Sequence, residues 1–469
     1  MLWFAERRRN RTVNQLTAES IAAAMDAIED GNLPSAMERC GRALEEDPDN
    51  PQWLRVAGLA HLGAGQFAQA VERLQRASEQ DPTLPGIFRD LGWALFLHGQ
   101  AARAAEVLEQ AAALDPDNAD TTARMGAALD ECGRHLEAQS ALERAVELAP
   151  DDADYATALG ECLNRQALHE QALARFEIAS ELDPQHLGAL YGKGVSLSHL
   201  GRAAEALPVF QVLLPQASRS PDLWYETGKA LYHLGELEQA KRALGNALLL
   251  DGEDGRVHLY LGATLVDLGD AHLDDALASY TRAIALMPDD AEAKLRLAFV
   301  HLKQGNLEQA DAGIRQLLDA DPDAADALAA RALIAERQGD LERAEASIAR
   351  IRAMEAPTAL AAVADVALSM RLKRPADAQR TVERALANPA LSEAERRLAK
   401  QAQADQVDQR EAQRKQVAVP VRAAQGRAGE HPGEVLGATR RGLRPARRLV
   451  GPRIRGRGQD SRRVHGSHS

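Results

Sequence analysis

The sequence is poor in aromatic residues and cysteine, and it has no long apolar run. Phe, Trp and Tyr make up 4% of the 469 residues, and there are three cysteines. Cys40, Cys132 and Cys162 form no C-x-x-C pair, so we expect small buried apolar residues, as in a reducing compartment. No run approaches the roughly 18 apolar residues that a membrane span needs. These features predict a cytoplasmic protein without membrane insertion.

The sequence motifs of common catalytic sites are also missing. There is no GxxxxGK[ST] phosphate loop, no GxGxxG after a strand, no GxSxG and no HExxH. His199 and His233 are 34 residues apart, but a zinc site wants three or four ligands. We therefore expect no catalytic residue, no cofactor and no metal site.

The chain has a sequence period of 34 residues instead. The landmarks that repeat are Gly58, Gly92, Gly126, Gly160, Gly194, Gly228 and Gly262, then Ala70, Ala104, Ala138, Ala172, Ala206 and Ala240, and Pro48, Pro82, Pro116, Pro150 and Pro184. The small residues let two helices approach closely, and the proline ends the second helix because it cannot continue one. A fixed period of this length is typical of stacked helix-turn-helix repeats.

This pattern resembles the tetratricopeptide repeat (TPR), in which the three landmarks occupy positions 8, 20 and 32. The resemblance covers about 80% of the chain, residues 17–392. It implies an all-α fold, a right-handed superhelical solenoid of about eleven 34-residue helix-turn-helix repeats.

Two repeats depart from the pattern. In the sixth, Ser218 replaces the landmark proline, and Pro208 and Pro215 fall within the expected second helix. An interior proline removes a backbone hydrogen bond and costs roughly 3 kcal/mol. We therefore expect a kinked or shortened helix there, and a candidate hinge near residues 208–221. The eighth repeat is two residues too long, and the surplus lies at 269–275.

The two ends of the chain lie outside the repeats. Residues 1–16 form a polar lead-in, and residues 393–416 are expected to form a charged helix that caps the stack or is solvated. Residues 1–409 carry 41 Lys and Arg against 65 Asp and Glu, whereas 410–469 carry 15 against 4. The acidic body argues against nucleic acid as its ligand. Residues 417–469, rich in Arg, Gly and Pro, are expected to be a disordered tail.

The basic tail has three interpretations. Its Arg-Arg pairs at 440, 447 and 462 and the Arg-Gly run at 455 suit phosphate contacts with RNA or DNA, or contacts with an acidic surface. It lacks the aromatic residues that would stack on bases. It is otherwise a solvated tail, or the product of a reading-frame slip in a GC-rich gene.

The resemblance also implies a binding surface. In TPR proteins, positions 2, 5, 9, 12 and 13 of the first helix line the concave groove that binds partners. Here these positions include Arg55, Arg89, Trp93, Phe96, Glu161, Asn164, Arg165, Tyr191, His199, Tyr225, Lys229, Tyr232 and His233. We expect groove exposure above all at Tyr225, Lys229 and Tyr232, because exposed aromatic and cationic residues dominate interface energies. The lysine and asparagine with which one TPR subclass binds chaperone C-termini, at positions 5 and 9, are absent.

The sequence therefore predicts a non-enzymatic scaffold whose concave groove binds peptides or helices of one or more partner proteins. The alternative is the TPR portion of a transferase of the glycosyltransferase or sulfotransferase type. Similar repeats precede such domains, but the residues after 392 are too few for one, so a frame slip would have removed it.

Overall fold

The computed structural model describes residues 18–354, 357–374, 377, 379–388, 396–397, 399–401 and 403–404. The chain divides into two units, Met1–Gln403 and Ala404–Ser469, and the described residues lie almost entirely in the first. The lead-in of residues 1–16, most of 393–416 and the tail from 417 lie outside the described residues.

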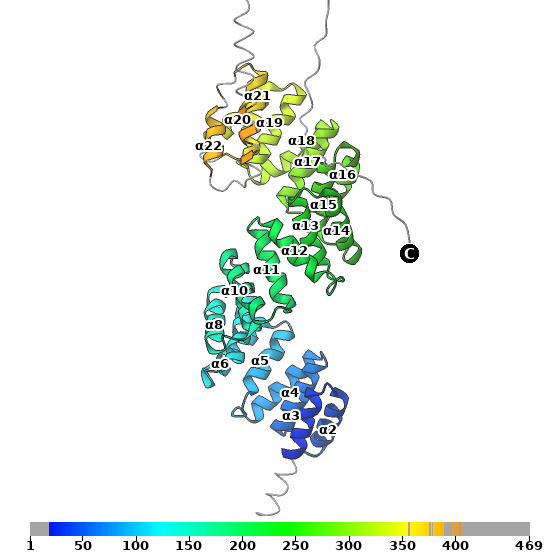
Figure 1. The fold of residues 1–469 in the computed structure, drawn as a ribbon, viewed down its shortest axis with the longest axis vertical. Helices are drawn as coiled ribbons and strands as arrows, with labels where there is room; N and C mark the ends of the chain where they lie inside the picture. The colour runs from blue at the N-terminus through cyan, green and yellow to red at the C-terminus, as the bar shows by residue number, and fades with distance from the viewer. Residues whose placement is uncertain are drawn as a thin grey trace, which may run out of the picture. The chain divides into compact units, whose positions relative to one another are not determined.

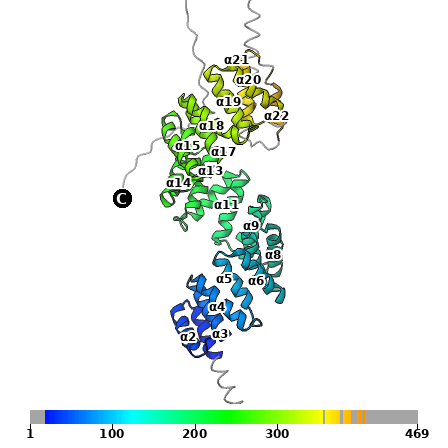
Figure 2. The same cartoon turned by 180° about the vertical axis from the view of Figure 1, so that it is seen from behind.

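The described residues form helix-turn-helix pairs, which follow one another in chain order (Figures 1 and 2). The first helices of the pairs, here called the A helices, span residues 18–29, α3 (Pro51–Gly63), α5 (Ile87–Leu97), α7 (Ala119–Glu131), α9 (Ala153–Arg165), α11 (Leu187–His199), α13 (Pro221–His233), α15 (Gly255–Leu268), α17 (Ala291–Gln304), α19 (Ala325–Gln338) and α21 (Ala359–Arg371). The second helices, the B helices, are α2 (Leu33–Glu46), α4 (Phe67–Gln80), α6 (Ala101–Leu114), α8 (His135–Leu148), α10 (His169–Leu182), α12 (Ala203–Leu213), α14 (Leu237–Leu250), α16 (Leu273–Leu286), α18 (Leu307–Ala320), α20 (Leu341–Ala353) and α22 (Gln379–Ala387).

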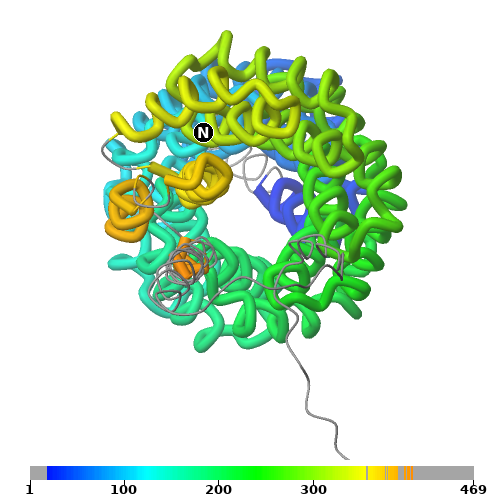
Figure 3. Tube along the Cα trace, turned by 90° about the horizontal axis from the view of Figure 1, so that it is seen from above, coloured from blue at the N-terminus to red at the C-terminus, as the bar shows by residue number. Residues whose placement is uncertain are grey.

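These pairs confirm the predicted solenoid. Within the unit of residues 1–403, the tube drawn in Figure 3 winds around a common axis, as expected of a superhelix. None of the helices in the described part of the chain is long and apolar enough to cross a membrane.

The landmark glycines lie where the two helices of a pair approach each other. A Cβ atom on Gly58 or Gly92 would lie 2.5 Å from Leu74 or Leu108 of the following B helix. No real side chain makes so short a contact without moving its neighbour, so the close approach requires glycine. The 34-residue period of these glycines thus records the packing of A on B.

Side chains and left-handed residues close the ends of several helices. The Asn50 and Asn118 side chains accept hydrogen bonds from the backbone N–H groups of Trp53 and Thr121, at 3.2 and 2.9 Å, and so cap α3 and α7. The A-to-B turns close with a left-handed residue. It is Gly99 in the third repeat, with φ +77°, and Ala167 in the fifth, with φ +58°.

Helix α12 is shorter than the B helices on either side of it. It contains Pro208 and ends after 11 residues, whereas α10 and α14 have 14 each. The expected shortening is therefore present, while the hinge stays a prediction. The surplus residues of the eighth repeat form a short 3-10 helix, η1 (Asp270–His272).

The three cysteines are unpaired thiols, as expected. Cys40 and Cys162 are buried and Cys132 is half-buried. Burial raises the pKa of the Cys40 thiol to about 11 and that of Cys162 to about 12. Both are therefore packed as small apolar residues.

Candidate functional site

One buried carboxylate holds two arginines from neighbouring repeats. Asp90 on α5 is 3% exposed. It accepts a hydrogen bond from Nε of Arg55 at 2.6 Å, and from Nε and Nη2 of Arg89 at 3.1 and 3.0 Å. Since Arg55 comes from α3, this ion pair joins two A helices and fixes both guanidinium groups.

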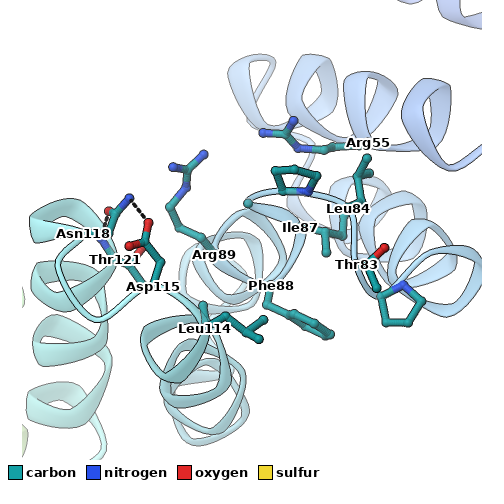
Figure 4. Close-up of a pocket in the computed structure, with 14 residues that line it drawn as sticks. Arg55, Thr83, Leu84, Ile87, Phe88, Arg89, Leu114, Asp115, Asn118 and Thr121 are labelled. Atoms are coloured by element: carbon teal, nitrogen blue, oxygen red, sulfur yellow. Dashed lines mark hydrogen bonds between the residues drawn. The ribbon is translucent and has the colours of Figure 1, made fainter.

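These arginines border a pocket of about 750 Å³ at the start of α5 (Figure 4). The other lining residues come from the 82–86 turn, the start of α5, the end of α6, the loop between α6 and α7, and α7; they are Pro82, Thr83, Leu84, Pro85, Gly86, Ile87, Phe88, Ala111, Leu114, Asp115, Asn118 and Thr121. Helix α5 begins two residues later than the 34-residue period places it. Gly86, in the left-handed conformation with φ +76°, is its N-cap and supplies no side-chain cap. The late start leaves room for the pocket.

An aromatic pair lies further along α5. The rings of Trp93 and Phe96 stack with centroids 5.1 Å apart. The Arg124 guanidinium carbon lies 4.9 Å from the Trp93 ring centroid, and Arg124 Nε is 2.7 Å from an oxygen of Asp120. Both aromatic side chains are half-buried. A cation thus covers one face of the only tryptophan in the predicted groove set.

Polar contacts follow along α9 and α11. Arg165 pairs with Asp130 at 2.9 Å, and the Asn164 amide donates to the Ser196 hydroxyl at 2.8 Å. The rings of His169 and His199 stack with centroids 4.5 Å apart. Within the described residues, no group of three His, Cys, Asp or Glu side chains is placed to hold a metal ion.

A tyrosine cluster follows on α13 and α15. The rings of Tyr225 and Tyr232 meet that of Tyr260 edge to face, with centroids 5.7 and 5.9 Å apart. Arg256 lies 5.0 Å from the Tyr225 centroid, and Lys229 Nζ lies 5.7 Å from it. Burial raises the pKa of Tyr232 to about 12. The A helices from α3 to α15 thus carry separate clusters of aromatic and charged side chains.

Family models agree with this architecture. One model described as tetratricopeptide repeat matches residues 27–85, 95–162 and 267–334, and a second model of the same description matches residues 165–221. Together these ranges cover more than half of the chain. The chain belongs to the tetratricopeptide repeat family. No curated protein matches it.

Solved TPR structures are similar over shorter spans. MamA from Desulfovibrio magneticus RS-1, residues 41 to the end, is 24% identical; the match covers 37% of this chain and 96% of that one, with a TM-score of 0.34. A thermophilic TPR protein from Thermus thermophilus is 27% identical; the match covers 38% of this chain and 95% of that one, with a TM-score of 0.33. YrrB, described as a TPR protein with an unusual peptide-binding site, is also 27% identical; the match covers 40% of this chain and 97% of that one, with a TM-score of 0.34.

The prediction that Tyr225 and Lys229 are exposed is wrong. Tyr225 is only 7% exposed and Lys229 only 9%. Arg256 and Tyr260 of the next TPR repeat pack against Tyr225, and Glu226 holds Lys229 Nζ at 3.2 Å. The neighbouring repeat therefore covers the positions that looked open in one repeat alone.

The other predicted groove residues keep some exposure. Those that are half-buried are Arg55, Arg89, Trp93, Phe96, Asn164, Tyr191 and Tyr232, and those that are exposed are Glu161, Arg165, His199 and His233. They do not form one site. The structure brings Arg55 and Arg89 together at the pocket, whereas Tyr232 and His233 lie with the tyrosine cluster.

Sequence reasoning missed Asp90 and Tyr260. Both occupy position 6 of their 34-residue repeat, which carries no family landmark, and both contact the preceding A helix. Opposite charges 35 residues apart, as in Arg55 and Asp90, are the signal that would have found the first ion pair.

Proposed function

We propose that this TPR protein is a non-enzymatic scaffold that binds peptide segments or helices of partner proteins on its A helices. The observation that carries the proposal is the pocket of about 750 Å³ bordered by Arg55 and Arg89. Pockets lined by apolar side chains with a few fixed polar groups are the usual form of a binding site.

Preorganisation supports this function. The Arg55, Arg89 and Arg124 side chains are each held by a carboxylate, and each stays 24–29% exposed. A partner that contacts them would not have to immobilise long side chains, which lowers the entropic cost of binding. Arginine and tryptophan are also the residue types that most often dominate interface energies.

The proposal is tested by capture of partners from an extract of the source cells, with the full chain as bait. We expect the R89A/W93A variant to lose partners that the wild type retains; Arg55 still pairs with Asp90 in that variant. The matched control is R103A/L249A, which removes one cation and one large apolar side chain from exposed positions on the B helices α6 and α14. Partners that bind both variants as they bind wild type, with all three proteins equally helical by circular dichroism, would contradict the proposal.

A further inference from the structure

Two guanidinium groups converge on one point of the pocket. Nη2 of Arg89 and Nη2 of Arg55 lie 3.1 and 3.3 Å from the place where a Cβ on Gly86 would be. Arg55 reaches this point from α3 and Arg89 from α5, on either side of the turn (Figure 4). Like charges repel at such distances, so the arrangement favours an anion between or beside them.

Asp90 accepts hydrogen bonds from only some of the donor groups of these two arginines. Among the described residues, the hydrogen-bond partner of the Arg55 guanidinium is Asp90, through Nε, which leaves both of its Nη groups available. Arg89 uses Nε and Nη2, and leaves Nη1. A guanidinium presents its donors in a planar fork that matches the two oxygens of a carboxylate.

The start of α5 adds to the positive potential. Its N-cap is glycine without a side-chain cap, whereas α3 and α7 on either side are capped by Asn50 and Asn118. The N–H of Ile87 donates to the carbonyl of Leu84 at 3.1 Å, so the helix dipole, rather than this group, favours negative charge at the start of α5.

The charges around the pocket select the kind of anion. Three arginines, Arg55, Arg89 and Arg124, lie at or beside the pocket with three carboxylates, Asp90, Asp120 and the rim residue Asp115, so the charges of these six side chains sum to zero. A bound carboxylate adds one negative charge near Asp115, whereas a doubly charged phosphate would add two, so the site favours the carboxylate.

Apolar side chains line another part of the pocket. Leu84, Ile87 and Phe88 line it, and Leu114 at its mouth is 72% exposed. A large apolar side chain beside the anion would remove this surface from water.

We propose that the pocket binds one Asp or Glu side chain of a partner peptide, together with a large apolar residue next to it in that peptide. The inference rests on the proposed scaffold function and names the class of segment that this site selects.

The test begins with selection from a library of short random peptides by the full-length wild-type protein. The expected pool is enriched in Asp or Glu beside Leu, Ile, Met or Phe. Enriched peptides without an acidic preference would overturn the inference and leave the scaffold function standing. A selection that enriches no peptide over a bait-free control would count against both.

One enriched peptide is then synthesised in three forms, with the acid, with its amide and with phosphoserine in its place. We expect the acid form to bind at least about tenfold more tightly than the amide, as for a charge-assisted hydrogen bond. Tightest binding of the phosphoserine form would show a phosphate site and overturn the assignment of a carboxylate.

Two substitutions at the pocket mouth locate the binding without disturbing the ion pairs. L114D places a negative charge beside the site and is expected to lower the affinity for the acid form of the peptide about tenfold. L114K is expected to bind this peptide at least as tightly as the wild type does. Leu114 is exposed, so both variants should have the same melting temperature as the wild type. Equal affinity of L114D and L114K would place the peptide elsewhere and overturn the inference.

Discussion

Gly192 of α11 lies against the ring of Phe176 from α10. A Cβ atom on Gly192 would lie 2.3 Å from Cε1 and Cζ of that ring. The same ring fills the space beside Gly160 of α9, where a Cβ would lie 2.8 Å away. One phenylalanine thus packs against two successive A helices, and glycine is needed at both contacts.

Substitution of Gly192 by alanine is expected to lower the free energy of unfolding by about 1–3 kcal/mol, because the ring cannot move away in a packed core. The matched control is G245A in the interior of α14, where a Cβ would meet no atom within 4 Å. That variant is expected to gain about 0.5–1 kcal/mol, since alanine is the better helix former. Urea unfolding measures both, and a loss of equal size in the two variants would contradict the packing described.

Ala167 offers a second test of the repeat geometry. It has φ +58° in a turn where the repeats on either side have glycine, Gly133 and Gly201. An L-residue in the left-handed conformation costs about 1–2 kcal/mol. We expect A167G to raise the free energy of unfolding by about 1 kcal/mol, and the reciprocal G133A, at φ +83°, to lower it. Thermal unfolding that shows both changes with the same sign would speak against these turn conformations.

Much of this fold could be predicted from the sequence, because glycine, alanine and proline recur wherever the backbone demands them. Gly92 and Pro116 each mark a constraint on the backbone that arises within a single repeat. The candidate site was less accessible. The Asp90 ion pair and the cover of Tyr225 by Tyr260 depend on how adjacent repeats meet, and position 6 has no family landmark. The late start of α5, which opens the pocket, depends on the Leu84–Gly86 turn rather than on the period.

The half-buried Arg352 forms an ion pair with the buried Asp365 near the end of the described solenoid. Asp365 is 0% exposed and accepts hydrogen bonds from Arg352 at 2.9 and 2.5 Å and from Thr381 at 2.7 Å, so it joins α20, α21 and α22. Loss of Arg352 leaves the buried Asp365 charge without its cation; since Arg352 is half-buried and Thr381 still donates to Asp365, the cost should lie below the roughly 3–5 kcal/mol of a fully buried pair.

We therefore expect R352A to speed backbone hydrogen exchange in α21 and α22. The control is R350A in the same turn of α20, which removes an exposed ion pair with Asp323 that is worth about 0–1 kcal/mol. If both variants exchanged like the wild type, Asp365 would not depend on Arg352.

His301 on α17 should make stability depend on pH. Its Nδ1 is buried without a hydrogen-bond partner among the described residues, and burial lowers the pKa of the imidazole. The unfolded chain therefore binds the proton more readily than the folded one, and this histidine destabilises the fold as pH falls from about 7 to about 5.

The H301L variant should lose less stability than the wild type over that range. Urea midpoints measured at several pH values give the comparison. Parallel curves for the two proteins would show that His301 titrates alike in the folded and unfolded states.

The claim that partners bind on the A helices is tested most directly by hydrogen exchange of the full chain with and without a selected acidic peptide. We predict slower exchange in α3, α5 and α7, where Arg55, Arg89 and Thr121 border the pocket. The middle of the B helices α4 and α8 should be unchanged. Protection confined to the B helices, or no change in any helix under saturating peptide, would contradict the claim.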